Sequence, residues 1–125
     1  MSKHIDLKTS KWLKEVGFDS KVTRMFDLIS TNVIDDAPKG NYNLTKHSVS
    51  IPEQDQVVDW LLEKYGIWVS VDLIENTHED KTLMFQFKAH KIKNNTKYST
   101  SIVFNSPTEA YREAFNHIRE NNILK

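Results

Sequence analysis

The sequence predicts an α+β fold in which an antiparallel three-stranded meander carries two helices on one face, in the order α-β-β-β-α, with an N-terminal helix and a candidate edge strand before it. Three observations predict this two-layer architecture: a helical apolar pattern after Pro52, three alternating segments over residues 67–104, and a second helical pattern after Ser106. The links between the alternating segments are too short for a parallel crossover, so the strands are expected to pair antiparallel. Two helices that flank such a meander can both bury their apolar sides on one sheet face.

The N-terminal part, residues 1–29, has the weakest pattern. Residues 6–16 predict a short helix that ends at a glycine, because glycine readily takes the left-handed conformation of a helix C-terminus. Residues 21–31 fit a strand or a helix, and the strand is favoured. Residues 30–51 are rich in Asp, Asn, Ser, Pro and Gly, so an irregular loop is expected there. The 125 residues are expected to form a single domain with the α-β-β-β-α core at 52–125.

The expected core begins with a helix from Pro52 to Gly66, where apolar residues recur every three to four positions. Three strands are expected to follow, at 67–74, 82–92 and 97–104. Alternation divides their side chains between an inner face under the helices and an outer face. The inner face is expected to hold Ile67, Val69, Val71, Leu73, Leu83, Phe85, Phe87, Ala89, Tyr98, Thr100, Ile102 and Phe104.

The last helix has the most specific start signal in the chain. Ser106 is the expected N-cap, and Pro107 occupies the first helical position, where its missing N–H costs nothing. Glu109 completes an S-x-x-E capping box. The apolar residues of this helix share one side, which is expected to cover a sheet face. They are Ala110, Tyr111, Ala114, Phe115 and Ile118.

Composition argues against several classes of function. The chain has no cysteine, which removes disulfides, zinc–thiolate sites and thiol nucleophiles and fits a reducing compartment, so a cytoplasmic location is expected. Its three glycines form no phosphate-binding or nucleophile-elbow motif, and its five histidines lack metal-ligand spacing. No apolar run approaches the ~20 residues needed to cross a bilayer. We therefore expect no enzyme and no catalytic residue, no metal, no cofactor and no membrane partner.

The outer face of the predicted sheet is the candidate protein-binding surface. It combines an aromatic residue and a methionine near its middle with charge toward one end, as the centre and rim of protein interfaces do. Its expected contact residues are Trp68, Met84, Gln86, Lys88, His90, Ser99 and Ser101. In the alternative that the sequence leaves open, the N-terminal segment folds over Trp68 through Trp12 and Phe26 and buries it.

Weak nucleic-acid binding is the alternative function. The order α-β-β-β-α is also that of the double-stranded RNA-binding domain, which grips phosphates with lysines at the start of its last helix. Here Glu109 stands near that position, and the net charge is zero, with 17 basic and 17 acidic residues. Lysines on a hairpin also protect sheet edges from aggregation. The lysines that could follow a nucleic-acid backbone beside Trp68 are Lys88, Lys91, Lys93 and Lys97.

A broader pattern joins a WL-x-E-x-x-G-I helix-to-strand turn to a C-terminal E-A-x-x-x-A helix. Three blocks carry it: KWLKEVGFD at 11–19, IPEQDQVVDWLLEKYGIWVSVD at 51–72 and SPTEAYREAFNHIRENNIL at 106–124. Together they resemble small uncharacterised proteins encoded by bacteriophages and prophages. The resemblance implies that the protein is of phage origin and is located in the cytoplasm of a host cell. It supplies no catalytic residue. The expected partner is a host or phage protein, for example a defence protein, or a second copy of the chain in a homodimer.

Overall fold

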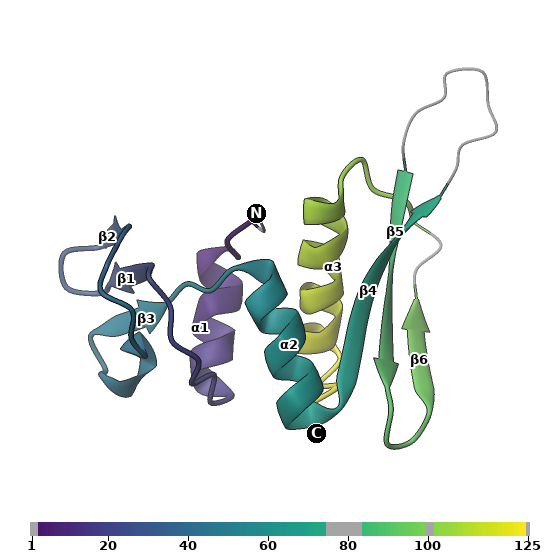
Figure 1. Ribbon diagram of the computed structural model, residues 1–125, viewed down its shortest axis with the longest axis horizontal. Coiled ribbons are helices and arrows are strands. Elements are labelled where there is room, and N and C mark those ends of the chain that lie inside the picture. Colours follow the sequence, from purple (N-terminus) through teal and green to yellow (C-terminus); the bar gives the residue numbers. More distant parts are fainter. Residues whose placement is uncertain (1–2, 75–83, 100–101, 125) are drawn as a thin grey trace. The chain divides into compact units, whose positions relative to one another are not determined.

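The computed structural model describes residues 3–74, 84–99 and 102–124 (Figure 1). In these residues the chain forms three α-helices and two three-stranded antiparallel sheets, so the α+β class is confirmed. Contacts within the chain group it into two compact units, Met1–Trp60 and Leu61–Lys125, and the single domain expected from the sequence stays a prediction.

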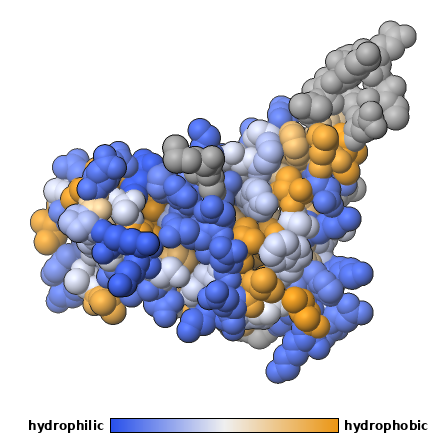
Figure 2. All heavy atoms as spheres, in the orientation of Figure 1, coloured by the Kyte–Doolittle hydropathy of each residue, from blue (hydrophilic) through white to orange (hydrophobic). Residues whose placement is uncertain are grey.

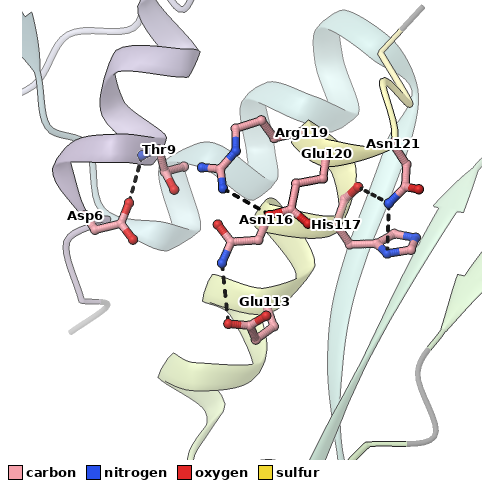
Figure 3. Close-up of polar contacts among 8 residues, drawn as sticks. All are labelled: Asp6, Thr9, Glu113, Asn116, His117, Arg119, Glu120 and Asn121. Carbon is pink, nitrogen blue, oxygen red and sulfur yellow. Dashed lines mark hydrogen bonds and ion pairs between the residues drawn. The ribbon is translucent and has the colours of Figure 1, made fainter.

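The first unit contains α1, Leu7–Glu15. Asp6 is its N-cap, and Asp6 Oδ1 accepts a hydrogen bond of 2.8 Å from the backbone N–H of Thr9 (Figure 3). This bond satisfies an amide at the helix start that has no partner within the helix. Val16 is the C-cap, and the Gly17 that follows has a φ of +92°, in the left-handed region, as the sequence indicates for the residue after a helix.

The first sheet consists of three short strands: β1 (Met25–Asp27), β2 (Asn32–Ile34) and β3 (Ser48–Ser50). Their order is β2-β1-β3, and both pairs are antiparallel. β1 therefore lies within residues 21–31, as the sequence predicts, but it is the central strand of its sheet and not an edge.

The prediction of an irregular loop over residues 30–51 is wrong. The segment contains β2, β3 and a short 3₁₀ helix, η1 (Tyr42–Leu44). Strands of three residues are too short to show clear alternation. The polar residues that favour turns join η1 to β3 instead: Asn43 Oδ1 accepts from the Ser50 N–H at 2.8 Å, and Ser50 Oγ accepts from the Tyr42 N–H at 3.0 Å.

The turn between β1 and β2 is held by Asp27. Its Oδ1 accepts from the Ile29 N–H and its Oδ2 from the Ser30 hydroxyl, both at 3.0 Å. Its carbonyl accepts from the Thr31 N–H at 2.8 Å, and Thr31 takes a φ of +58°. The bond from the Ile29 N–H is the largest cause that lowers the pKa of Asp27, and the Ser30 hydroxyl adds to it, because both favour the charged carboxylate.

Replacement of Asp27 by asparagine is expected to destabilise the protein at neutral pH and to have less effect in acid. Because the folded-state pKa is lowered, the stabilisation is present above the unfolded-state pKa and is lost as the pH falls through the folded-state pKa. Asparagine does not titrate, so the difference in urea midpoint between wild type and Asp27→Asn should shrink between about pH 7 and about pH 3. A difference of the same size at both pH values would contradict this role of the carboxylate.

Helix α2 (Gln54–Tyr65) spans the boundary between the two units in sequence. Its apolar residues Val57, Val58 and Leu61 are buried, as the helical pattern predicts. Gly66 has a φ of +63° and leads the chain directly into the second sheet.

The second sheet is formed by β4 (Ile67–Ile74), β5 (Met84–Lys91) and β6 (Thr96–Ser99), in that order. Both pairs are antiparallel, which confirms the meander. Beyond β6, Phe104 returns to β5, where its backbone exchanges two hydrogen bonds of 2.9 Å with the backbone of Phe85. Of the predicted inner residues, Leu83 and Thr100 lie outside the described residues.

Helix α3 (Pro107–Glu120) contacts β4 and β5 and begins as the capping box predicts (Figure 1). Ser106 Oγ accepts from the Glu109 N–H at 3.2 Å. The buried residues of α3 are Ala110, Ala114, Phe115 and Ile118. After its last turn, Asn121 Nδ2 donates to the His117 carbonyl at 2.9 Å (Figure 3).

The alternation in the second sheet is clear at one end and weaker at the other. Ile67, Val69, Phe87 and Ala89 are buried, as predicted for the inner face. Leu73 and Ile102 are instead 58% and 64% exposed, so their assignment to a buried inner face is wrong. Leu73 pairs with Phe85 at the end of the sheet remote from the β5–β6 turn, and Ile102 lies beyond the last residue of β6.

Candidate interaction surface

The face of the second sheet opposite α3 carries two rows of polar and aromatic side chains. The rings of Phe87 and Tyr98 lie 5.8 Å and 5.7 Å from the ring of His117, which places them on the α3 side. In a sheet, directly paired residues share a face and neighbours along a strand alternate. The opposite face, here called the Trp68 face, therefore holds the rows Trp68–His90–Lys97 and Ser70–Lys88–Ser99.

The two rows border a depression of about 290 Å³. The sequence leaves open whether Trp68 is exposed or buried under the N-terminal segment. In the structure Trp68 is 45% exposed. An aromatic ring among hydroxyl, imidazole and ammonium groups can pack against an apolar side chain while the surrounding groups form hydrogen bonds. The lining residues are Trp68, Ser70, Lys88, Ala89, His90, Lys97, Tyr98 and Ser99.

The charge of the Trp68 face is low. Lys88 Nζ lies 3.1 Å from Asp72 Oδ2, with both side chains substantially exposed, so the pair contributes little to stability but offsets one ammonium charge. Lys97 adds a second, exposed ammonium group. His90 Nε2 lies 2.9 Å from Asn95 Oδ1 in the β5–β6 turn, a contact that orients the imidazole at the turn end of the face.

The structure brings together four of the seven residues predicted for protein binding. Trp68, Lys88, His90 and Ser99 all line the depression. Gln86 and Met84 share the face by register, since they pair with Asp72 and Ile74, but they lie farther along the strands and do not line the depression. Ser101 lies outside the described residues.

Sequence reasoning missed Ser70, Ala89 and Tyr98 as lining residues of the depression, and it offered Lys97 only for nucleic-acid binding. Ser70 lies on β4 with its side chain on the outer face, so the alternation of this strand was a usable signal for it. Tyr98 belongs to the inner face by alternation and reaches the depression at the edge strand β6, for which the sequence gives no signal.

The four lysines of the nucleic-acid alternative do not share one surface. Lys88 and Lys97 belong to the Trp68 face. Lys91 is three residues from Lys88, so alternation puts it on the other face, where its Nζ donates to the Ile123 carbonyl at 3.0 Å. Lys93 is exposed in the β5–β6 turn. The expectation of a continuous four-lysine track is therefore corrected to two lysines beside Trp68.

Comparisons with known proteins give no relative from which a site can be transferred. No protein-family model, curated protein or solved structure matches the chain. Over the part of the chain that the structure describes, no cluster of three or more histidine, aspartate or glutamate side chains is arranged to hold a metal ion. Among the same residues, no helix has the length and apolar character needed to span a bilayer.

Proposed function

We propose that this chain is a small, non-enzymatic, phage-type protein that binds another protein through the Trp68 face. The observation that carries the proposal is Trp68 itself, 45% exposed beside a depression in a hydrogen-bonded sheet. Tryptophan is enriched among the residues that dominate binding energy, especially where polar groups surround it. The proposed partner is a host or phage protein in the host cytoplasm, for example a component of a defence system, as the resemblance to phage proteins implies.

The sheet gives this surface a low entropic cost of binding. Trp68 pairs with His90, and β5 pairs in turn with β6, so the backbone of all three strands is fixed before a partner arrives. Only side-chain rotamers remain to be ordered, and such pre-organisation increases the affinity that a given contact area provides.

Weak nucleic-acid binding is the second candidate, because an exposed aromatic ring beside lysines can stack on a base while the ammonium groups contact phosphates. The described face offers only Lys88 and Lys97 for this purpose, and Lys88 already pairs with Asp72. Two phosphate contacts are few for a binder whose affinity comes from lysine–phosphate contacts.

A salt titration is expected to separate the two candidates. Two lysine–phosphate contacts give a slope of about −1.4 for log affinity against log salt on single strands, or about a sevenfold loss between about 50 and 200 mM salt. Binding of a protein partner centred on Trp68 should depend less on salt. Fluorescence anisotropy measures both affinities as a function of salt, one with a labelled single-stranded oligonucleotide and the other with a partner captured from host lysate.

The charge reversal Lys97→Glu serves as the matched variant. The protein-binding proposal is wrong if the oligonucleotide binds more tightly than the protein partner and two further conditions hold: the slope of log affinity against log salt is about −1.4, as expected for two lysine–phosphate contacts, and Lys97→Glu abolishes the binding. If the chain pairs with itself through the Trp68 face, light scattering should show a dimer that Trp68→Ala converts to a monomer.

A further inference from the structure

A second depression, of about 440 Å³, lies within the first unit between α1 and the first sheet. One wall is formed by α1, and the opposite wall by the β1–β2 turn and the segment before β3. We call it the α1 groove. Its lining residues are Lys11, Lys14, Glu15, Leu28, Lys46 and Val49.

Hydrogen bonds fix the walls of the α1 groove. Lys14 Nζ donates to the carbonyls of Thr45 and Ser48, at 2.5 Å and 2.6 Å, and so ties α1 to the segment that leads into β3. The Leu28 N–H donates to the His47 carbonyl at 2.8 Å, which ties the β1–β2 turn to the same segment. The segment before β3 is thus tied to α1 through the Lys14 side chain and to the β1–β2 turn through a backbone hydrogen bond.

The floor of the groove is apolar and continues onto exposed apolar surface. Val49 is buried, and Leu28 is 37% exposed. The same hairpin exposes Ile29 (73%) and Val33 (46%), and Figure 2 shows apolar surface at the β1–β2 hairpin, at the left of the view. Ile29 is held by its bond to Asp27, so this exposed side chain belongs to an ordered turn. Apolar surface of this kind, next to polar residues, is typical of protein-interaction sites.

The rim of the groove is basic. Lys14 is engaged with backbone carbonyls, whereas Lys11 on α1 and Lys46 on the opposite wall are exposed. Glu15 is the one acidic residue in the lining. An occupant with carboxylates on either side of an apolar side chain would place the apolar group over Leu28 and Val49 and its charges beside Lys11 and Lys46.

We propose that the α1 groove binds a short segment of a partner protein in which leucine-like side chains are flanked by carboxylates. This surface is separate from the Trp68 face and does not depend on the function proposed for that face. Charge complementarity with the basic rim and the fit of an apolar side chain to the floor define the occupant.

The test uses the full chain and a fluorescein-labelled 12-residue peptide in which pairs of leucine residues alternate with pairs of glutamate residues. Saturable binding is expected in fluorescence anisotropy. The double variant Lys11→Glu/Lys46→Glu should weaken it at least tenfold, and Leu28→Asp should weaken it similarly. Lys39→Glu is the matched control, because Lys39 is an exposed lysine of the first unit that lines a different pocket, and it should leave the affinity unchanged. Trp68→Ala should also leave it unchanged, which separates this proposal from the proposed function.

Several results would overturn the proposal. Equal weakening by Lys39→Glu, or equal affinity for a peptide with serine in place of leucine, would show general charge attraction. Tighter binding of a 12-nucleotide single strand or of vesicles containing anionic phospholipid, lost in Lys11→Glu/Lys46→Glu, would assign the groove to phosphate groups. The thermal midpoint of each variant is measured first, and Lys46→Glu alone replaces the double variant if the latter does not fold.

Discussion

Replacement of Phe115 by alanine is expected to lower the free energy of unfolding by about 3–5 kcal/mol. Phe115 lies on the buried side of α3, with 1% of its surface exposed, and its ring centroid is 6.2 Å from that of Tyr111. Truncation removes the transfer free energy of the ring and leaves a cavity that the neighbouring side chains fill only in part. Since a domain of this size is stable by about 5–15 kcal/mol, the variant should be at the edge of folding.

Urea denaturation followed by circular dichroism measures this loss. Arg112→Ala is the control on the same helix, because Arg112 is exposed and its replacement should change stability by no more than about 0.5 kcal/mol. If Phe115→Ala is as stable as the control, the assignment of this side of α3 to the core is wrong.

Replacement of Trp68 by alanine is expected to lower the affinity for the proposed protein partner by about 2 kcal/mol or more, which is about 30-fold. The indole is the largest aromatic ring system among the lining residues, and its neighbours His90 and Lys97 are polar and cannot replace it. The effect on folding should be much smaller than that of Phe115→Ala, because Trp68 is already 45% exposed in the free protein.

Isothermal calorimetry with the captured partner measures the change in affinity, and thermal unfolding of the same sample reports the change in stability. Leu44→Ala is the control, since Leu44 is 82% exposed in the first unit and does not line the depression. Loss of affinity by the same factor in Leu44→Ala, or unfolding of Trp68→Ala, would remove Trp68 from the centre of the proposed interface.

The regular part of the fold could be predicted because its signals are long or chemically specific. α2 repeats its apolar residues over twelve positions, β4 alternates over eight, and Ser106, Pro107 and Glu109 mark the start of α3. The first sheet could not be predicted in the same way, because each of its strands has three residues and pairs with segments up to 25 positions away, as in Met25 with Ser50. Such pairing depends on tertiary contacts that a local pattern does not contain.

The candidate surfaces, too, could be predicted from the sequence only in part. Alternation alone was enough to place Trp68, Lys88 and His90 on one face, but the rows across the sheet depend on the register of the strands, which alternation does not fix. The α1 groove had no signal in the sequence. Its lining comes from α1, the β1–β2 turn and the segment around β3, and only the tertiary fold brings Lys11, Leu28 and Lys46 to one place.

The two-sidedness of β4 has a consequence for how such a protein can evolve. Ile67 and Val69 maintain the packing on one side, while Trp68 and Ser70 alternate with them along the chain and face the other way. Substitutions at the outward positions can therefore change the chemistry of the Trp68 face at little cost in folding. The exposed side of this strand can therefore diverge in sequence while the interior packing is kept.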